Sequence, residues 1–226
     1  MAGIIGISTA EQGRYSLFYA FLSGLYRPEN TTTVFASGAV ISENRNKITQ
    51  AALDRGADWV LYLDDDHVLQ ADTLYKLLDA EKDIISAHYV KRKPPFNPVL
   101  MQGKVNSGGF LWKQLGAAER GIIEVDAAGA GCLLVRRRVL EALKPPYWTL
   151  GQINPASWGD DLDFCNRVKA AGFPIYCDLD NRIGHIMSGI VTPEYDAKNG
   201  WVAGFTVDPS QAPLSRWLMP LPGDDC

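Results

Sequence analysis

The stretch "WVLYLDDDHVL", residues 59–69, joins an apolar run to three adjacent carboxylates. The apolar part predicts a buried strand. Asp64, Asp65 and Asp66 repel one another and cost stability unless a positive charge neutralises them. A divalent cation is the usual solution, because hard cations prefer oxygen ligands. The alternative is a solvated turn, since Asp is common in loops and at helix starts. The triplet alone leaves both interpretations open.

The composition is that of an ordinary globular protein, with 226 residues, 46% hydrophobic and 21% charged. This length accommodates one large α/β domain or two small ones. The net charge of −4 gives the whole molecule no general attraction for nucleic acid. Two basic clusters, "VKRKPP" and "VRRRV", are candidates for contact with a polyanion. The alternative for each is a solvated face or a diphosphate-binding loop.

The cysteines and the N-terminal region indicate a cytoplasmic protein, or one of the host cytoplasm if the source is viral. Cys132, Cys165, Cys177 and Cys226 form no CxxC pair, and three of them lie in apolar segments. Buried free thiols in a reducing compartment are therefore expected. The N-terminus lacks the pattern of a signal peptide. The apolar segment 15–26 is too short to span a bilayer and predicts a core helix.

Strands and helices alternate along the first half of the chain, which predicts an α/β fold with a mostly parallel central sheet flanked by helices on both faces. In the helix over 15–26, Phe18, Phe21, Leu22 and Leu25 are expected to face inward. Ser42 is the expected N-cap of the next helix. The segment 100–128 receives no assignment. The predicted strands are 2–8, 32–38, 58–63, 83–90 and 174–180. The other predicted helices are 42–56, 72–80 and 159–172. Residues 129–143 are predicted to form a turn, a strand and a helix in that order.

Ligands of open α/β sheets bind beyond the carboxyl ends of the strands. This rule places Ser8, Gly38 and the triplet along one rim of the predicted sheet. The position of the triplet at this rim favours the metal interpretation over the solvated turn.

A second acidic group, Asp160, Asp161 and Asp163, stands at the start of the helix over 159–172. Acids there commonly cap a helix and complement its dipole. The functional alternative is a carboxylate that takes a proton from a substrate hydroxyl. His185 with two carboxylates would suit Mn²⁺ or a related ion. His67 is a lesser candidate, because we expect its side chain to point away from that of Asp66.

In their order along the chain, three motifs resemble those of nucleotide-sugar glycosyltransferases with the GT-A fold, in particular the family-2-like inverting enzymes. "GADWVLYLDDDHVLQADTL" looks like the strand, DxD motif and helix of that family, and "GAGCLLVRRRVLEAL" like its central acceptor-side strand and helix. "WGDDLDFCNRVKAAGFPIYCDLDNRIGH" looks like its "ED" helix with the downstream strand and histidine. The match covers residues 57–187. It implies a single catalytic domain over 1–206, with a nucleotide-sugar-binding half (1–100) and an acceptor half (101–206), followed by a proline-rich tail (207–226).

The resemblance also implies roles for individual residues. Asp66 would ligate the metal, Mn²⁺ or Mg²⁺, while Asp64 would hold the ribose or reach the metal through water, and His185 would complete the site. Asp65 would position the sugar. Arg45 in "ENRNK" would neutralise the diphosphate or contact the base, and Ser8 and Thr9 would line the nucleotide pocket. Asp161 would be the general base, with Asp160 in the position where the family usually has Glu, which leaves the choice between the two open.

The implied activity is transfer of a sugar from a nucleoside diphosphate sugar, a UDP-sugar by the general preference of the family, to an acceptor hydroxyl. Short chains of this kind resemble those of viruses and phages, so a hydroxymethylated base in DNA is one candidate acceptor. Tyr89, Phe96, Trp148 and Trp158 could then stack on a flipped base or simply pack. Saccharide, lipid-linked and protein acceptors remain open. The rival functions are a nucleotide-sugar-binding protein without activity and a metal-dependent phosphoester hydrolase.

Overall fold

The structure is a computed structural model of the whole chain. It describes residues 1–9, 15–92, 97–104, 110–116, 118–153, 156–187, 190–196, 200–206 and 219–220. Expectations for Phe96 and for most of the tail after 206 fall outside these ranges.

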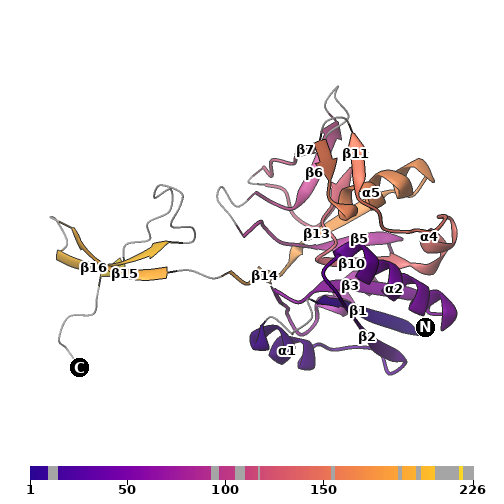
Figure 1. Ribbon diagram of the computed structural model, residues 1–226, viewed down its shortest axis with the longest axis horizontal. Helices are drawn as coiled ribbons and strands as arrows, with labels where there is room; N and C mark the ends of the chain where they lie inside the picture. The colour runs from indigo at the N-terminus through magenta and orange to yellow at the C-terminus, as the bar shows by residue number, and fades with distance from the viewer. Residues whose placement is uncertain are drawn as a thin grey trace.

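A seven-stranded sheet lies at the centre of the molecule, in the order β2-β1-β3-β10-β5-β13-β8 (Figure 1). It contains strands from both halves of the chain. β1 pairs in parallel with β2 and β3, and β13 pairs in parallel with β5. The strands are β1 (Gly3–Thr9), β2 (Thr31–Ser37), β3 (Trp59–Asp64), β5 (Ile84–His88), β8 (Ile122–Val125), β10 (Cys132–Arg136) and β13 (Ile175–Arg182).

The expectation of a mostly parallel sheet is wrong for the pairings, because the sheet is mixed. β10 lies antiparallel between β3 and β5, and β8 is antiparallel at the edge. Cys132 at the start of β10 pairs with Leu63 near the end of β3, and Arg136 pairs with Trp59. The chain therefore enters β10 at the carboxyl end of β3 without a helical crossover, and a strand entered at that end must run backward.

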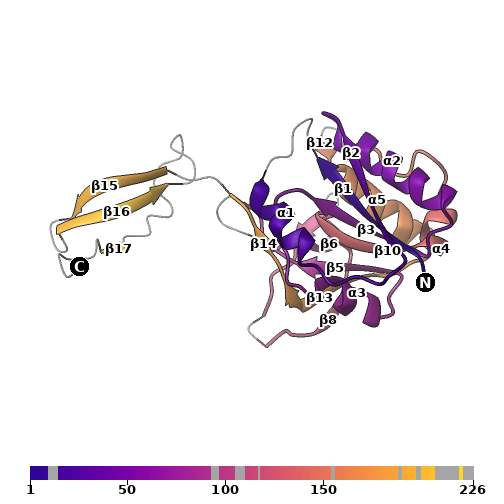
Figure 2. The same cartoon turned by 90° about the horizontal axis from the view of Figure 1, so that it is seen from below.

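Helices cover both faces of the sheet, as the expected α/β class requires (Figure 2). Alternate residues of β3 face opposite sides. Val60 and Tyr62 pack with α2, α4 and α5, whereas Leu61 and Leu63 pack with α1 and α3. The helices are α1 (Ser16–Ser23), α2 (Ile41–Asp54), α3 (Thr73–Asp79), α4 (Arg137–Glu141) and α5 (Asp160–Ala170).

The remaining strands form small sheets beside the central one. The segment that sequence patterns left unassigned contains β6 (Leu100–Lys104), β7 (Phe110–Trp112) and β9 (Ala127–Ala128), which pair with one another, as well as β8. β4 (His67–Val68) pairs with β14 (Gly184–His185), and β11 (Gly151–Ile153) pairs with β12 (Ala156–Trp158). β15 (Ile190–Asp196), β16 (Gly200–Thr206) and β17 (Met219–Pro220) form a sheet apart from the central one (Figures 1 and 2).

Several local expectations can be compared with the structure. Phe18, Leu22 and Leu25 are buried, but Phe21 is 37% exposed, because the buried face of α1 runs through Phe18 and Leu22 and Phe21 lies beside it. Ser42 is not an N-cap: α2 begins one residue earlier, with Val40 in the cap position, and Ser42 is buried inside the helix.

The buried thiols are confirmed for the three cysteines in the described part of the chain. Cys132, Cys165 and Cys177 are free and buried, and burial raises the pKa of each thiol to about 12. Cys226 lies outside the described residues. No helix in the described ranges has the length and apolar character needed to cross a bilayer.

Gly6 of β1 allows α2 to approach the sheet. A Cβ at Gly6 would lie 2.2 Å from Cγ2 of Ile48, a fully buried residue of α2. We expect Gly6→Ala to lower the free energy of unfolding by about 1–3 kcal/mol in urea titrations, because the helix must shift. Gly24→Ala is the control, since its Cβ would meet only ordinary contacts at 3.7 Å and beyond. Equal effects at the two positions would contradict this account.

Candidate functional site

A pocket of about 290 Å³ lies where the parallel strands β1, β2 and β3 end together. Thr9 pairs with Ser37 and Ser8 with Asp64, so the three strands stop at one rim. The rim predicted for Ser8, Gly38 and the acid triplet is therefore confirmed. The pocket is lined by Ser8, Thr9, Gly38, Ala39, Ile41, Asn44, Asp64, Asp65, Asp66 and Arg92.

Hydrogen bonds hold the wall of this pocket in place. Asn44 of α2 donates through its side-chain amide to the carbonyl oxygens of Thr9 (3.3 Å) and Gly38 (3.1 Å). Gly38 adopts φ +151°, a conformation that side chains disfavour. The Thr9 hydroxyl donates to Asp65 Oδ2 at 2.7 Å. Thr9, predicted to line the nucleotide pocket, and Asp65, predicted to position the sugar, thus lie in direct contact.

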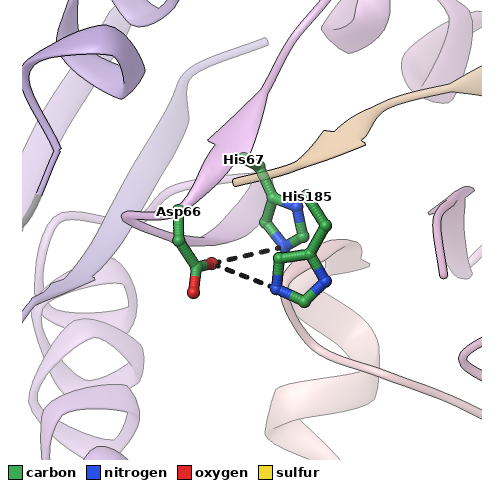
Figure 3. Close-up of side chains that lie close together, drawn as sticks. All are labelled: Asp66, His67 and His185. Carbon is green, nitrogen blue, oxygen red and sulfur yellow. Dashed lines mark ion pairs between the residues drawn. The ribbon is translucent and has the colours of Figure 1, made fainter. Parts of the chain in front are cut away.

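Asp66, His67 and His185 form a cluster that could hold a metal ion (Figure 3). One candidate ligand atom from each lies within 4.8 Å of the others. Asp66 Oδ1 is 3.5 Å from Nε2 of His185 and 3.9 Å from Nε2 of His67. Ligands bound at roughly 2.0–2.2 Å from one ion are separated by about this much.

The local backbone explains how residues far apart in sequence meet here. His67 and His185 are direct partners in the antiparallel β4–β14 pair, so their side chains share one face, with ring centroids 4.6 Å apart. Asp65 and Asp66 form the turn between β3 and β4. The expectation that His67 points away from Asp66 is wrong, because this turn breaks the alternation of side chains that an extended strand would have.

Both imidazoles are oriented for metal binding. Nδ1 of His67 lies 3.1 Å from the carbonyl oxygen of Gly184, and Nδ1 of His185 lies 2.8 Å from that of Val90. A carbonyl oxygen only accepts, so each Nδ1 carries the proton and each Nε2 keeps its lone pair for a ligand role. Backbone carbonyls commonly orient metal-binding histidines in this way.

The charges of the cluster suit a cation. Burial lowers the pKa of His67, as does the neighbouring His185, which favours the neutral imidazole that a metal requires. Burial alone would raise the pKa of Asp66, but its neighbours His185, His67 and Arg92 outweigh it and lower that pKa. The carboxylate is therefore ionised at neutral pH.

Glycine makes room for the imidazoles. A Cβ at Gly131 would lie 2.3 Å from Nε2 of His67 and 2.9 Å from the Tyr89 hydroxyl. The backbone amide of Gly131 donates to that hydroxyl at 3.0 Å, and the Tyr89 ring packs edge-on against both imidazoles. The "GAG" turn before β10 thus shapes the cluster.

The donor set bears on the choice of ion. Two imidazoles and one carboxylate suit Mn²⁺, Fe²⁺ or Zn²⁺ better than Mg²⁺, which prefers an octahedron of oxygens. Of the two ions expected from the sequence, the cluster favours Mn²⁺. The expected ligand Asp64 is not among its members and is engaged elsewhere.

Asp64 and Asp160 share one buried cation, Arg45. Nη2 of Arg45 donates to Asp64 at 2.9 and 3.2 Å, and Nη1 donates to Asp160 at 2.8 Å. Burial would lower the pKa of Arg45, but the two carboxylates raise it, so the guanidinium stays charged. Arg45 is not among the residues that line the pocket. Its expected contact with a diphosphate or base therefore has no support in this arrangement.

The two candidate bases on α5 differ in their surroundings. Asp160 is buried and paired with Arg45, whereas Asp161 Oδ1 accepts the backbone amide of Leu162 at 2.8 Å. Burial, with smaller contributions from Asp160 and Asp64, raises the pKa of Asp161 although Arg45 opposes this. Neither caps the helix through its side chain, since Gly159 holds the N-cap position. A raised pKa favours Asp161 as the proton acceptor.

The two basic clusters lie in different places, and only one of them reaches the pocket. Arg136, Arg137 and Arg138 stand at the end of β10 that pairs with the start of β3, opposite the pocket. Arg138 pairs with Asp83 (2.7 Å) and Arg137 with Glu141 (3.6 Å). Two of its three arginines are therefore neutralised locally, and Arg136 donates to the carbonyl oxygen of Leu78 at 3.1 Å.

The other basic cluster supplies a residue that sequence reasoning did not single out. Arg92 lines the pocket and pairs with Asp66 Oδ2 at 2.9 Å. Arg92 follows β5, whose carboxyl end lies at the same rim as that of β3. This position after a predicted strand was the feature of the sequence that could have identified Arg92 as a site residue.

The aromatic residues proposed to stack on a base serve the interior where they are described. Trp148 is buried and stacks on Phe164, with ring centroids 4.0 Å apart. Tyr89 is buried against the imidazoles. For these two residues the structure supports the second alternative, packing in the interior, over stacking on a base. The side chains of Phe96 and Trp158 are not among those that the structure describes.

Comparisons with known proteins bear on the fold alone. No family model matches the chain, and no curated protein matches it. Among solved structures, the chain is similar to the crystal structure of A197 from STIV, with a TM-score of 0.58 and 18% sequence identity, covering 83% of this chain and 87% of that one.

We expect the cluster to select transition metals. Calorimetric titration should show binding of Mn²⁺ or Zn²⁺ and much weaker binding of Mg²⁺. His67→Ala and His185→Ala should each lower Mn²⁺ affinity at least about tenfold, because each removes one ligand. His88→Ala is the matched control, since His88 is the remaining histidine of the chain and no member of the cluster. Equal losses in all three variants would count against the site.

We expect Arg45→Met to lower the free energy of unfolding by about 3–5 kcal/mol, because it leaves buried carboxylates without their cation. Arg55→Met, at the exposed C-cap of the same helix, should change it by less than about 0.5 kcal/mol. The double variant Arg45→Met/Asp160→Asn should lose less than the two single variants together. Urea denaturation measures all of these, and simple additivity would contradict the proposed pairing.

Proposed function

We propose that the protein is a metal-dependent, inverting glycosyltransferase of the GT-A type, which takes its sugar from a nucleoside diphosphate sugar. The observation that carries the proposal is the position of Asp66. This carboxylate belongs both to a three-residue cluster suited to a metal and to a pocket at the carboxyl ends of parallel strands. Such rims are where α/β proteins bind nucleotides.

Each part of the site has a task in this reaction. Ser8, Thr9 and Asn44 line the pocket in which the nucleotide would lie. Asp66, His67 and His185 would hold the ion, which when bound stabilises the negative charge of the departing diphosphate. Asp64 and Asp65, which line the same pocket, would contact the ribose and the sugar.

Asp161 would act as the general base. It would take the proton of the acceptor hydroxyl as that oxygen attacks the anomeric carbon from the face opposite the diphosphate, and this single displacement inverts the configuration. Its raised pKa suits a proton acceptor. Asp160 is less suited, because its carboxylate is paired with Arg45. Asp161 does not line the pocket itself, but it follows Asp160, which Arg45 links to Asp64 of the pocket lining.

The acceptor is proposed only as a hydroxyl group. A hydroxymethylated base in DNA remains one candidate, but the "VRRRV" cluster no longer supports it, because it lies away from the pocket and two of its three arginines pair with carboxylates. Saccharide acceptors fit the mixed charge of the rim equally well.

The test is a screen of nucleotide sugars for release of nucleoside diphosphate in the presence of Mn²⁺, with and without hydroxymethylated DNA. We expect one donor to be consumed, and Asp161→Asn to lower the rate about 100-fold or more while donor binding persists. Asp163→Asn, which changes the same helix turn, is the control and should retain activity.

Three outcomes would contradict the proposal. Release of inorganic phosphate would indicate a phosphoester hydrolase. If the protein binds a donor without turning it over, and Asp161→Asn leaves the donor affinity unchanged, the protein is a binding protein. Absence of donor binding with every sugar nucleotide would remove the function altogether.

A further inference from the structure

We propose that Arg92 is the diphosphate-binding cation of the pocket and that metal binding releases it from Asp66 for this purpose. The inference rests on the proposed function and extends it to one residue of the "VKRKPP" cluster, for which the sequence left a diphosphate-binding loop open without naming a residue. It concerns how the site recognises a doubly charged diphosphate group.

The charges around the pocket motivate the proposal. Asp64, Asp65 and Asp66 line the pocket, and Arg92 is the one cation among its described lining residues. Arg45 compensates Asp64 from the interior and is only 3% exposed. An anionic ligand entering this pocket would therefore meet carboxylates unless Arg92 and a metal ion together reverse the sign of the field.

Asp66 directs its two oxygens to different partners. Oδ1 faces the imidazoles, and Oδ2 accepts from Nη1 of Arg92 at 2.9 Å. A cation held by Oδ1 and the imidazoles would lie roughly 5–7 Å from the guanidinium, because one carboxylate separates them. Two positive charges at this spacing offer one contact to each phosphate of a diphosphate, whereas a monophosphate engaged by the ion leaves no second phosphate for the guanidinium.

The pairing of Arg92 changes when an ion occupies the cluster. In the structure the positive charge of Arg92 compensates Asp66. A divalent ion would compensate the same carboxylate more fully, so the guanidinium would become available to an incoming anion. Guanidinium groups bind phosphate oxygens in a bidentate manner, which favours this exchange of partners.

The backbone around Arg92 is positioned for such a role. The amide of Lys91 donates to the carbonyl of Asn97 at 2.9 Å, and Val90 forms an antiparallel bridge with Pro98. Val90 also accepts the proton of His185 Nδ1 through its carbonyl. The same short segment thus orients a metal ligand and places the arginine, while the side chain of Arg92 is 40% exposed and able to turn toward a ligand.

The test measures binding by calorimetry, with UDP, UMP and inorganic pyrophosphate as probes in the presence of Mn²⁺. We expect Arg92→Ala to weaken UDP and pyrophosphate binding about ten- to hundredfold, and UMP binding by clearly less, because a charged hydrogen bond to one phosphate is lost. The UDP affinity of Arg92→Lys should lie between those of the wild type and Arg92→Ala, since lysine keeps the positive charge but loses the bidentate donor geometry of the guanidinium. Lys91→Ala, the exposed neighbour that does not line the pocket, is the matched control and should bind like the wild type.

Titration of Mn²⁺ alone separates this role from a merely structural one. Removing Arg92 removes a positive charge and a competitor for Asp66, so Mn²⁺ affinity should stay equal or rise. A fall in Mn²⁺ affinity as large as that for UDP would mean that Arg92 only positions Asp66, and would overturn the inference. Unchanged UDP affinity in Arg92→Ala would overturn it as well.

The failure of the inference can be told from that of the proposed function. If the wild type binds neither UDP nor pyrophosphate with Mn²⁺, both fall together. If the wild type binds UDP and transfers sugar while Arg92→Ala matches it in binding, only the inference about Arg92 falls.

Discussion

The rest of the site depends on one buried guanidinium. Arg45 joins the end of β3, through Asp64, to the start of α5, through Asp160. Charges out of contact with water are costly unless they are paired with good geometry, and a planar guanidinium can serve two carboxylates at once. The Trp148 ring lies 5.3 Å from the guanidinium carbon and covers it. The arrangement therefore ties the pocket rim to the helix that carries the candidate base.

Helix α2 positions both sides of this connection. Asn44 holds the ends of β1 and β2 through two carbonyls, and Asn46 bonds the backbone of Tyr147 and Trp148. Thr49 joins the Tyr62 hydroxyl and the Trp148 indole in one buried polar network. Polar residues along α2 thus fix the ends of β1 and β2, the loop at residues 147–148 and the two carboxylates bound by Arg45 relative to one another. Gly6 lets this helix lie close to the sheet.

The carboxylates of the triplet have separate partners, which answers the problem of their mutual repulsion. Asp64 is compensated by Arg45, Asp65 accepts a hydrogen bond from Thr9, and Asp66 faces Arg92 and the two imidazoles. Three adjacent acids are tolerated because each meets a different partner. The turn after β3 makes this divergence feasible, since consecutive side chains of a strand would only alternate between two faces.

Much of the architecture follows from local patterns in the chain. The alternation of apolar runs and amphipathic helices determined the α/β class, the buried strands at the N-terminal half and the rim on which Ser8, Gly38 and the triplet meet, because periodicity and strand direction are local properties. Tertiary structure alone decided the insertion of β10 between β3 and β5, which made the sheet mixed. It also decided that His67 pairs across strands with His185, that Arg45 faces inward, and that Arg92 rather than Arg45 lines the pocket. Each of these depends on contacts between residues distant along the chain, and no spacing within a single segment encodes which distant charge will stand opposite a given carboxylate.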